Sequence, residues 1–364
     1  MSEKPTILVL GKLPPPLIGP AIATDIILNS RLNQEFNLLH LDTRLNTDVA
    51  TMGRWSFSKL FKTRTLHKKY KAMLVEHKPD LVLIPISQTS MGFLKDYPFL
   101  KIAHKQGIKT VVQLRGSNFL NWINSSSTWI QKTVRKGLGM AEGVIVLGEN
   151  LRYLFEDYFP KNRIFVVSNG ANYRLENSRS DELEILYLAN FLPSKGFDDV
   201  LEAVVLLKEK GITNFRLNAA GAWDNPNFKK KCTEIIADNN LANVDLLLPV
   251  SGKDKMQLLA NASIFVFCPR MPEGHPWVIV EALANALPVL ATDQGAIVES
   301  VLHENNGYIV PANDPEAIAI HLEKLIGDAN LRGQFSTASL VHYRNNFTEE
   351  KMVEQLSKVF KTLI

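Results

Sequence analysis

The chain has 364 residues, of which 46% are hydrophobic and 21% charged, which fits a globular protein of two ordinary domains. Its two cysteines, Cys232 and Cys268, give no disulfide framework and no metal-binding spacing, and no apolar run approaches the roughly 20 residues that cross a bilayer. The net charge is only +4, but residues 1–175 carry 24 Lys and Arg against 12 Asp and Glu, so this half is expected to meet something anionic. The start lacks the form of a signal peptide, and we expect a cytoplasmic protein.

The first half alternates short apolar runs with longer mixed segments, a pattern that predicts a parallel sheet covered by helices. The expected strands are 6–11, 37–42, 80–85, 110–114, 143–147 and 163–167. The expected helices are 21–32, 54–78, 93–107 and 127–140, with a further one beginning at 149–150.

Two loops of this half carry candidate ligand-binding residues. The loop after the first strand contains Gly19, which can bring the backbone close to a ligand, although an ordinary strand–helix turn explains it equally well. Arg115 follows the strand 110–114. It does not deprotonate and so cannot be a general base, but its guanidinium can bind a phosphate or an acidic acceptor.

A basic segment lies between these loops. From Arg54 to Lys71 there are seven basic residues and no acidic one, with aromatic residues at 55, 57, 61 and 70. Such a helix can be a membrane-surface element or a site for an anionic acceptor. It can also be an amphipathic helix whose apolar side faces the core, and for this segment alone we prefer that interpretation.

The second half repeats the strand–helix pattern after a polar linker at 173–181. The expected strands are 183–190, 215–221, 244–248, 264–268 and one that begins at 288. The expected helices are 197–210, 223–239 with its leading loop, 253–261, 276–285, 315–326 and 349–363. Lys195 and Gly196 directly follow the first of these strands, and Val250 lies in the loop after the third.

The loop 269–275 and the helix after it form the most informative stretch. Pro276 is suited to the first turn of a helix, whose N-terminus offers unpaired N–H groups to phosphate oxygens. Glu273 precedes this helix, at the sheet edge where doubly wound folds bind ligands, and Glu281 lies near its second turn. Two such carboxylates can hold a polyhydroxyl ligand. On spacing alone, a loop charge and a solvated helix residue explain them better.

The sequence from Glu273 to Glu281, EGHPWVIVE, resembles the donor-site signature of the family 4 glycosyltransferases, retaining enzymes of the two-Rossmann GT-B fold. Their pattern is Glu-Gly-x-Pro/Gly-x-x-x-x-Glu, followed by a Gly-x-Pro-Val-like strand in which Ala286 here replaces the glycine. The segments 292–299 and 306–310 also fit the family. Because several pieces occur in order, the match is specific, and it covers most of residues 5–360.

The resemblance implies an α/β fold of two Rossmann-like doubly wound parallel-sheet domains facing across a cleft, with a C-terminal helix that crosses back. Residues 1–172 with 345–364 would form the acceptor domain, and 173–344 the nucleotide-sugar donor domain. The implied activity is that of a retaining hexosyltransferase, which moves a sugar from a nucleotide-diphosphate-sugar to an acceptor hydroxyl. No Asp-x-Asp stands in a metal-binding context, so no catalytic metal and no cofactor is expected.

The family's donor-site roles carry over as follows. Glu273 would hold the hydroxyls of the transferred sugar, and Glu281 the ribose. Lys195 would neutralise the departing diphosphate. The other residues expected at the donor are Gly19, Val250, Gly274, His275, Pro276, Trp277 and Val278.

Two positions depart from the family pattern. Asn190 stands where the family's Gly-Arg-x-x-x-x-Lys-Gly loop has arginine, so Asn190 would donate a hydrogen bond instead, or Arg270 or Arg115 would supply the second charge. Arg115 itself stands where relatives have a histidine near the donor sugar. Front-face attack, in which the leaving phosphate takes the acceptor proton, would need no protein base.

The expected partners are a nucleotide-sugar donor and a glycan or lipid-linked acceptor, with contact to an anionic membrane surface through Arg54 to Lys71 and no nucleic acid. The expected process is cell-surface polysaccharide or glycolipid assembly at the inner face of the cell membrane. Two alternatives stay open. One is a sugar-nucleotide epimerase of the same architecture, although the first-domain loops offer few acid–base residues. The other is a non-catalytic sugar-nucleotide or membrane-binding module.

Overall fold

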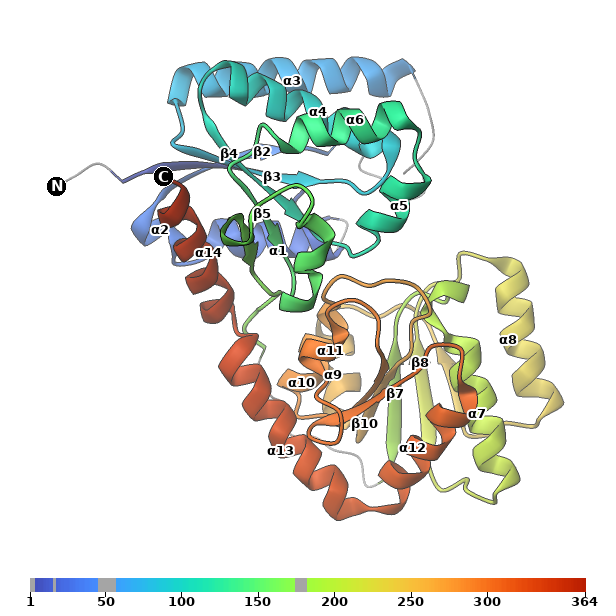
Figure 1. Cartoon of the computed structure of the whole chain (residues 1–364). Helices are drawn as coiled ribbons and strands as arrows, with labels where there is room; N and C mark the ends of the chain where they lie inside the picture. Colours follow the sequence, from blue (N-terminus) through green and yellow to red (C-terminus); the bar gives the residue numbers. More distant parts are fainter. Residues whose placement is uncertain (1–3, 16–17, 45–56, 174–181) are drawn as a thin grey trace. The chain divides into compact units, whose positions relative to one another are not determined.

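The computed structural model describes residues 4–15, 18–44, 57–173 and 182–364, the first five of the third range by their backbone alone. The chain forms two compact units (Figure 1). The first consists of Met1–Ala171 and Glu349–Ile364, and the second of Asn172–Thr348. The predicted domain boundaries, 172 and 345, differ from these by one and four residues.

The first unit is built on a parallel sheet with the strand order β2-β1-β3-β4-β5-β6. Its strands are β1 (Thr6–Gly11), β2 (Asn37–Asp42), β3 (Leu81–Ile86), β4 (Lys109–Leu114), β5 (Gly143–Val146) and β6 (Ile164–Val166). Its helices are α1 (Gly19–Asn29), α2 (Leu32–Glu35), α3 (Phe57–His77), α4 (Ser90–Lys105), α5 (Phe119–Ser125), α6 (Thr128–Leu138) and α14 (Glu349–Leu363), with 3-10 turns η2 (Glu149–Phe155) and η3 (Lys161–Arg163). Helices α3, α4 and α6 cover one face of the sheet, and α1, α2 and α14 the other (Figure 1).

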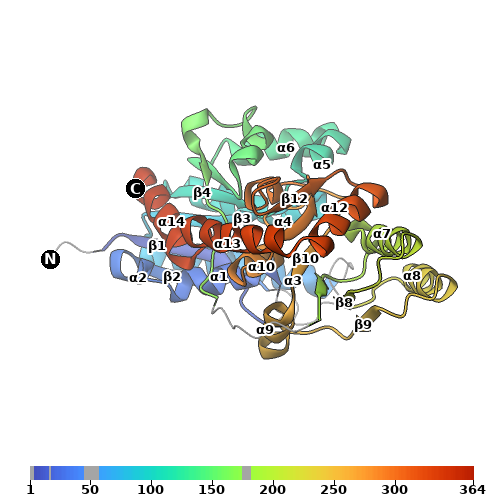
Figure 2. The same ribbon diagram turned by 90° about the horizontal axis from the view of Figure 1, so that it is seen from below.

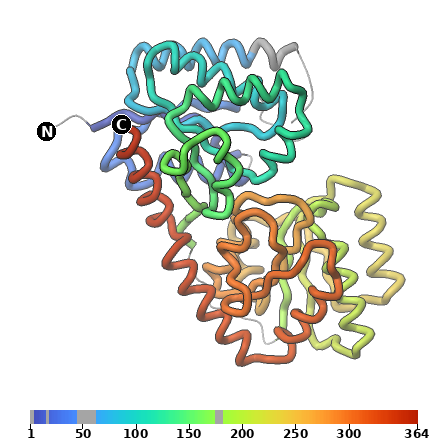
Figure 3. The backbone as a smooth tube through the Cα atoms, in the orientation of Figure 1, coloured from blue at the N-terminus to red at the C-terminus, as the bar shows by residue number. Residues whose placement is uncertain are grey.

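The C-terminal helix α14 packs against the beginning of the chain, as the tube in Figure 3 shows. The rings of Phe36 and Phe360 meet edge to face with their centroids 5.6 Å apart. Ser357 Oγ donates a hydrogen bond of 2.8 Å to Glu35, and Lys361 forms an ion pair with the same carboxylate. The expected return of the chain to its first domain is therefore confirmed.

The second unit has a parallel sheet with the order β12-β11-β10-β7-β8-β9. Its strands are β7 (Glu184–Leu188), β8 (Arg216–Ala220), β9 (Val244–Leu247), β10 (Ile264–Phe267), β11 (Val289–Thr292) and β12 (Gly307–Val310). Its helices are α7 (Phe197–Glu209), α8 (Pro226–Asp238), α9 (Gly252–Asn261), α10 (Trp277–Ala284), α11 (Ile297–Ser300), α12 (Pro315–Gly327) and α13 (Ala329–Asn346), with the 3-10 turn η4 (Pro193–Lys195). The direction in which strands are added reverses between β7 and β10, which makes this the switch point where such sheets bind ligands.

Glycines allow the loops at this switch point to meet backbone to backbone. Gly196 has φ +68°, and a Cβ there would lie 1.9 Å from the carbonyl oxygen of Cys268. Gly295 has φ +59°, and a Cβ there would lie 1.5 Å from the carbonyl oxygen of Glu273. Only glycine fits both the space and the backbone conformation. The loops after β7, β10 and β11 are thus fixed together at one edge of the sheet.

Some elements differ from the sequence-based expectations. Helices α5 and α13 were not predicted, and Pro276 is the N-cap of α10 instead of its first helical residue. Residues 54–56 and 174–181 lie outside the described part of the chain, so the start of the basic segment and most of the linker stay predictions.

The described part of α3 is amphipathic, as preferred from the sequence. Leu66, Tyr70 and Leu74, spaced one turn apart, are buried, and the Tyr70 ring packs against Phe99. Within the described ranges, no helix is both long enough and apolar enough to cross a bilayer.

Candidate functional site

An ion pair joins the two segments that follow β7 and β10, the strands on either side of the switch point in the second unit. Lys195 ends the 3-10 turn that follows β7, and Glu273 lies in the loop that follows β10. Lys195 Nζ donates to Glu273 Oε1, and the two side chains keep 26% and 18% of their surface exposed. The structure thus brings together two predicted donor-site residues that are 78 positions apart in sequence, and leaves both within reach of a ligand.

Arg270, in the same loop, is already matched by two buried carboxylates. Its Nε donates to Asp199 Oδ2 at 2.7 Å, and its Nη2 lies 3.0 Å from Asp198 Oδ1. The hydrogen bonds that Arg270 donates to Asp199 raise the pKa of Arg270 above its ordinary value. These contacts hold the β10 loop against α7, and a role of Arg270 as the second cation at the diphosphate stays a prediction.

Glu281 is a buried carboxylate on α10 with an unused acceptor. Its Oε1 accepts from Lys255 Nζ at 2.5 Å and from the hydroxyl of Tyr173 at 3.3 Å. Its side chain is 3% exposed, and Oε2 has no hydrogen-bond partner among the residues that the structure describes. A buried acceptor without a donor is unfavourable, so the geometry suits a hydroxyl group supplied by a ligand. Sequence reasoning identified Glu281 but missed Lys255 and Tyr173, because nothing in their spacing links them to it.

The remaining residues of this loop are largely covered. Gly274 and Trp277 are buried, and no side chain caps the N-terminus of α10 behind Pro276. Val278 is half-buried and packs against the core of the unit. The backbone of the helix start, and not these side chains, is therefore the part suited to bind phosphate.

His275 is held inside the unit. Its Nε2 lies 2.7 Å from Ser300 Oγ, and its ring packs against Phe347. Burial, assisted by His342, lowers the pKa of His275 from 6.5 to about 3, so the ring is neutral at physiological pH. His275 therefore supports the loop from behind and does not present a charge to a ligand.

This burial makes a prediction about acid stability. Because the folded protein keeps His275 neutral, the unfolded chain binds one proton more once the pH falls below 6.5, and stability is lost as the pH falls. Between about pH 7 and about pH 5 this group alone should remove about 2 kcal/mol. Urea unfolding of the wild type and of His275→Gln at both pH values measures it. An equal loss in the two proteins would contradict the assignment.

Two further predicted residues lie on the same edge without touching the ion pair. Asn190 is exposed after β7, and its Oδ1 accepts a hydrogen bond of 3.4 Å from the backbone of Ala222. Val250 is half-buried after β9, two residues from Leu248, whose side chain is highly exposed. These positions extend the candidate site from the loops after β7 and β10 toward the loop after β9.

In the first unit, Arg115 follows β4 and Gly19 begins α1. Arg115 Nη1 donates to Asn169 Oδ1 at 3.2 Å, and burial lowers the pKa of Arg115 to about 10, so it is charged at neutral pH. No carboxylate pairs with Arg115 among the residues that the structure describes. A covered cation with an amide as its partner suits an anionic ligand.

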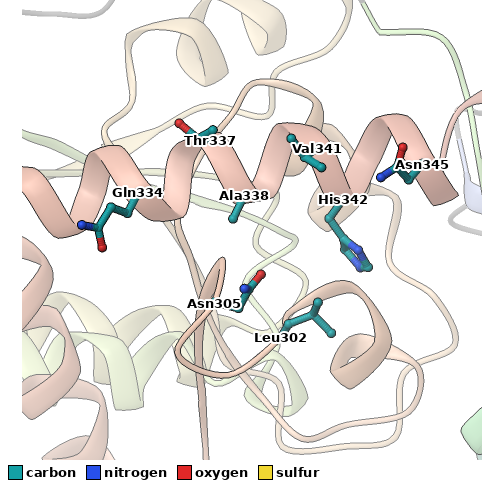
Figure 4. A pocket seen from close by; sticks show the side chains of 8 residues that line it. All are labelled: Leu302, Asn305, Gln334, Thr337, Ala338, Val341, His342 and Asn345. Atoms are coloured by element: carbon teal, nitrogen blue, oxygen red, sulfur yellow. The ribbon is translucent and has the colours of Figure 1, made fainter.

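Two other observations bear on the site. In the described ranges, no three His, Cys, Asp or Glu side chains gather in a group that could hold a metal ion. A groove of about 550 Å³ runs along α13 and the segment before β12 (Figure 4). Its lining residues are Leu302, Asn305, Gln334, Thr337, Ala338, Val341, His342 and Asn345. Because Leu302 and Asn305 precede β12, this groove lies at the opposite edge of the sheet and is not the candidate site.

The family model described as "Glycosyl transferases group 1" matches residues 172–342. The capsular polysaccharide biosynthesis glycosyltransferase CapM of Staphylococcus aureus is 26% identical over 242 residues, which is 62% of each chain. The N-acetyl-alpha-D-glucosaminyl L-malate synthase of Bacillus anthracis is 23% identical over 266 residues, 70% of this chain and 68% of that protein. The matches cover 62%, 55% and 65% of the length of three curated relatives, CapM included, which is less than two thirds.

Solved structures resemble the whole chain. The Anabaena protein Alr3699/HepE, solved in complex with UDP, superposes with a TM-score of 0.76 at 14% identity, over 98% of this chain and 100% of that one. Sucrose-phosphate synthase from Thermosynechococcus elongatus gives 0.75 at 15% identity, over 99% of both. At such identities the likeness concerns the fold, and it confirms the predicted class of two Rossmann-like α/β domains of the GT-B type.

Proposed function

We propose that this protein is a retaining glycosyltransferase that acts on a nucleotide-diphosphate-sugar, since residues 172–342 match the family model of the glycosyl transferases group 1. The sugar would pass to a hydroxyl group of a glycan or lipid-linked acceptor. The observation that carries the proposal is the Lys195–Glu273 pair at the switch point of the second unit.

The pair suits the chemistry of a departing nucleoside diphosphate. Breaking the bond between sugar and phosphate places negative charge on the leaving oxygen, and a positioned cation stabilises that charge most in the transition state. Lys195 is this cation, and the backbone N–H groups at the start of α10 add to it. Glu273, freed as Lys195 turns to the phosphates, accepts hydrogen bonds from hydroxyls of the transferred sugar.

Glu281 provides the second anchor. Its buried Oε2 would accept a hydrogen bond from a ribose hydroxyl, since no donor reaches this atom from the described part of the chain. Lys255 and Tyr173 hold the carboxylate in place from the other oxygen. These two roles explain why the side chain of Glu273 is partly exposed, whereas that of Glu281 is enclosed.

The reaction is proposed to proceed without a metal and with retention of configuration. Arg115 stands where relatives have a histidine, and it stays charged at neutral pH, so it binds an anionic group and does not accept a proton. The leaving phosphate would take the acceptor proton in a front-face attack. Because CapM and the Erwinia amylovora protein AmsK are named for capsular polysaccharide and amylovoran biosynthesis, cell-surface polysaccharide assembly on the cytoplasmic side is the proposed process.

A donor panel tests this function. Purified protein is incubated in EDTA with UDP-, GDP-, ADP- and dTDP-sugars, while its melting temperature and the release of nucleoside diphosphate are followed. One nucleotide should raise the melting temperature by mass action, and its sugar should be released or transferred with its anomeric configuration kept. Stabilisation without turnover, even with candidate acceptors, would favour a non-catalytic binding module. No stabilisation by any nucleotide would contradict the proposal.

A further inference from the structure

The outer face of helices α3, α4 and α6 is strongly basic. These helices expose ten Lys and Arg side chains in their described parts, five from α3, two from α4 and three from α6. Glu76, near the end of α3, is the acidic side chain exposed among them, whereas Asp96 on α4 is buried and accepts from the backbone of Ser87. This excess of positive charge accounts for most of the +12 found in the first half of the chain.

The three helices form one continuous layer. Helix α4 lies between α3 and α6, and the three run side by side over the same face of the sheet (Figures 1 and 2). Their apolar sides face inward, through Leu66 and Tyr70 of α3, Phe99 of α4 and Val134 of α6. The cations therefore lie on the outside of a broad layer, and not around a groove that would enclose a single chain.

Three representative cations of this layer are not compensated by any acidic side chain in the described part of the chain. Lys68 of α3, Lys101 of α4 and Lys132 of α6 are exposed, and none of the three forms an ion pair among the described residues. Uncompensated charges spread over three helices repel one another and destabilise the unit slightly. An external anionic surface would offset that repulsion.

An exposed tryptophan stands among these charges. Trp129 is the second residue of α6 and is 62% exposed. Lys132 and Lys136 lie three and seven residues further on, which places them on the same side of the helix. Indole rings favour the boundary between water and lipid, where an apolar body and a polar N–H are both satisfied. Lysine stems bury their methylene groups at the same level while their charges stay in water.

We propose that this three-helix layer docks on an anionic lipid bilayer, with its lysines at the headgroup phosphates and Trp129 at the interface. The surface contains the described part of the basic segment from Arg54 to Lys71 and extends it to two further helices. It is independent of the donor site, so the failure of one proposal leaves the other standing.

Vesicle co-sedimentation tests the proposal. The full chain is mixed with vesicles of phosphatidylcholine and with vesicles that also contain phosphatidylglycerol, at low and at raised salt. Each surface lysine contributes about 1 kcal/mol of attraction to an anionic membrane, so the variant Lys68→Gln/Lys101→Gln/Lys132→Gln should bind the anionic vesicles about 100-fold more weakly. Wild-type binding should fall with salt, whereas the loss caused by Trp129→Ala should persist at raised salt.

A matched control lies in the second unit. Lys210, Lys229 and Lys230 are also exposed, and their replacement by glutamine removes the same charge from another surface. This control should bind the anionic vesicles like the wild type, and no variant should melt at a clearly lower temperature than the wild type. Equal loss in both triple variants, or equal binding to neutral vesicles, would overturn the proposal. So would a soluble anionic polysaccharide that binds the layer while vesicles fail to compete.

Discussion

Replacing Lys195 by methionine is expected to lower kcat about 10²- to 10³-fold, which is typical when one positioned group that stabilises a developing oxyanion is removed. Methionine keeps most of the length and apolar stem of lysine, so the loop after β7 should stay folded. Because the lost interaction belongs mainly to the transition state, KM for the donor should change much less than kcat. Steady-state kinetics with the donor found in the panel measures both constants.

The control for this variant is Lys210→Met. Lys210 also forms an ion pair in the second unit, with Glu323, but both side chains are exposed; Lys210 directly follows α7, and Glu323 lies on α12. Such a surface pair contributes little to stability, and this variant should keep wild-type kcat. A Lys195→Met enzyme that kept its kcat, or that lost activity only through a raised KM, would show that Lys195 does not act on the leaving group.

Replacing Lys255 and replacing Glu281 are expected to differ in which property they impair more: the first should mainly lower stability, and the second should mainly weaken nucleotide binding. Lys255→Met leaves the carboxylate of Glu281 buried with the Tyr173 hydroxyl as its donor, and should destabilise the second unit by about 3 kcal/mol. Glu281→Gln should cost less, because Lys255 is 25% exposed and its ammonium can reach water. For nucleotide binding we expect the reverse order. Glu281→Gln should weaken binding more than Lys255→Met does, since glutamine offers a weaker acceptor to the ribose. Urea unfolding and nucleotide titration measure the two effects.

Lys255→Arg completes this set. Arginine keeps the charge next to Glu281, so it should recover much of the stability that methionine loses. A Glu281→Gln protein that bound nucleotide as tightly as the wild type would contradict the ribose assignment, whatever its stability. A Lys255→Met protein of wild-type stability would show that the buried carboxylate is satisfied in another way.

Much of the fold could be predicted because buried parallel strands are short, continuous apolar runs. The strands 6–11 and 37–42 were predicted with the bounds that the structure has, and α14 likewise. The positions of Lys195 and Glu273 followed from the same pattern, since residues directly after parallel strands gather at one edge of the sheet. Their pairing at the switch point is what the structure adds.

Helix α13 escaped prediction because small polar side chains face the core between the buried aromatic residues Phe335 and Tyr343. Ser336 donates to the carbonyl of Ala286 at 2.6 Å, and Ser339 donates to that of Leu287 at 2.7 Å. These bonds satisfy backbone groups after α10, but they erase the apolar periodicity by which an amphipathic helix is recognised.

The residues that pair with the charged side chains of the site could not be predicted from their spacing in the sequence. Asp199 lies 71 positions from Arg270, Tyr173 lies 108 from Glu281, and Lys255 lies 26 from the same carboxylate. Each contact depends on how whole elements pack, which a local pattern does not encode. As a result, the sequence offered Arg270 as a candidate second cation without its partners, and the structure shows it held by two carboxylates.

Hydrogen–deuterium exchange with and without the stabilising nucleotide tests most directly whether the switch-point edge of the second unit is the donor site. We expect slower exchange in peptides that cover 193–197, 249–252 and 273–281, in the wild type at saturating nucleotide and without metal. Exchange in the groove along α13, around Val341, should not change (Figure 4). Protection confined to that groove, or found in the first unit alone, would contradict the assignment of the donor to these loops.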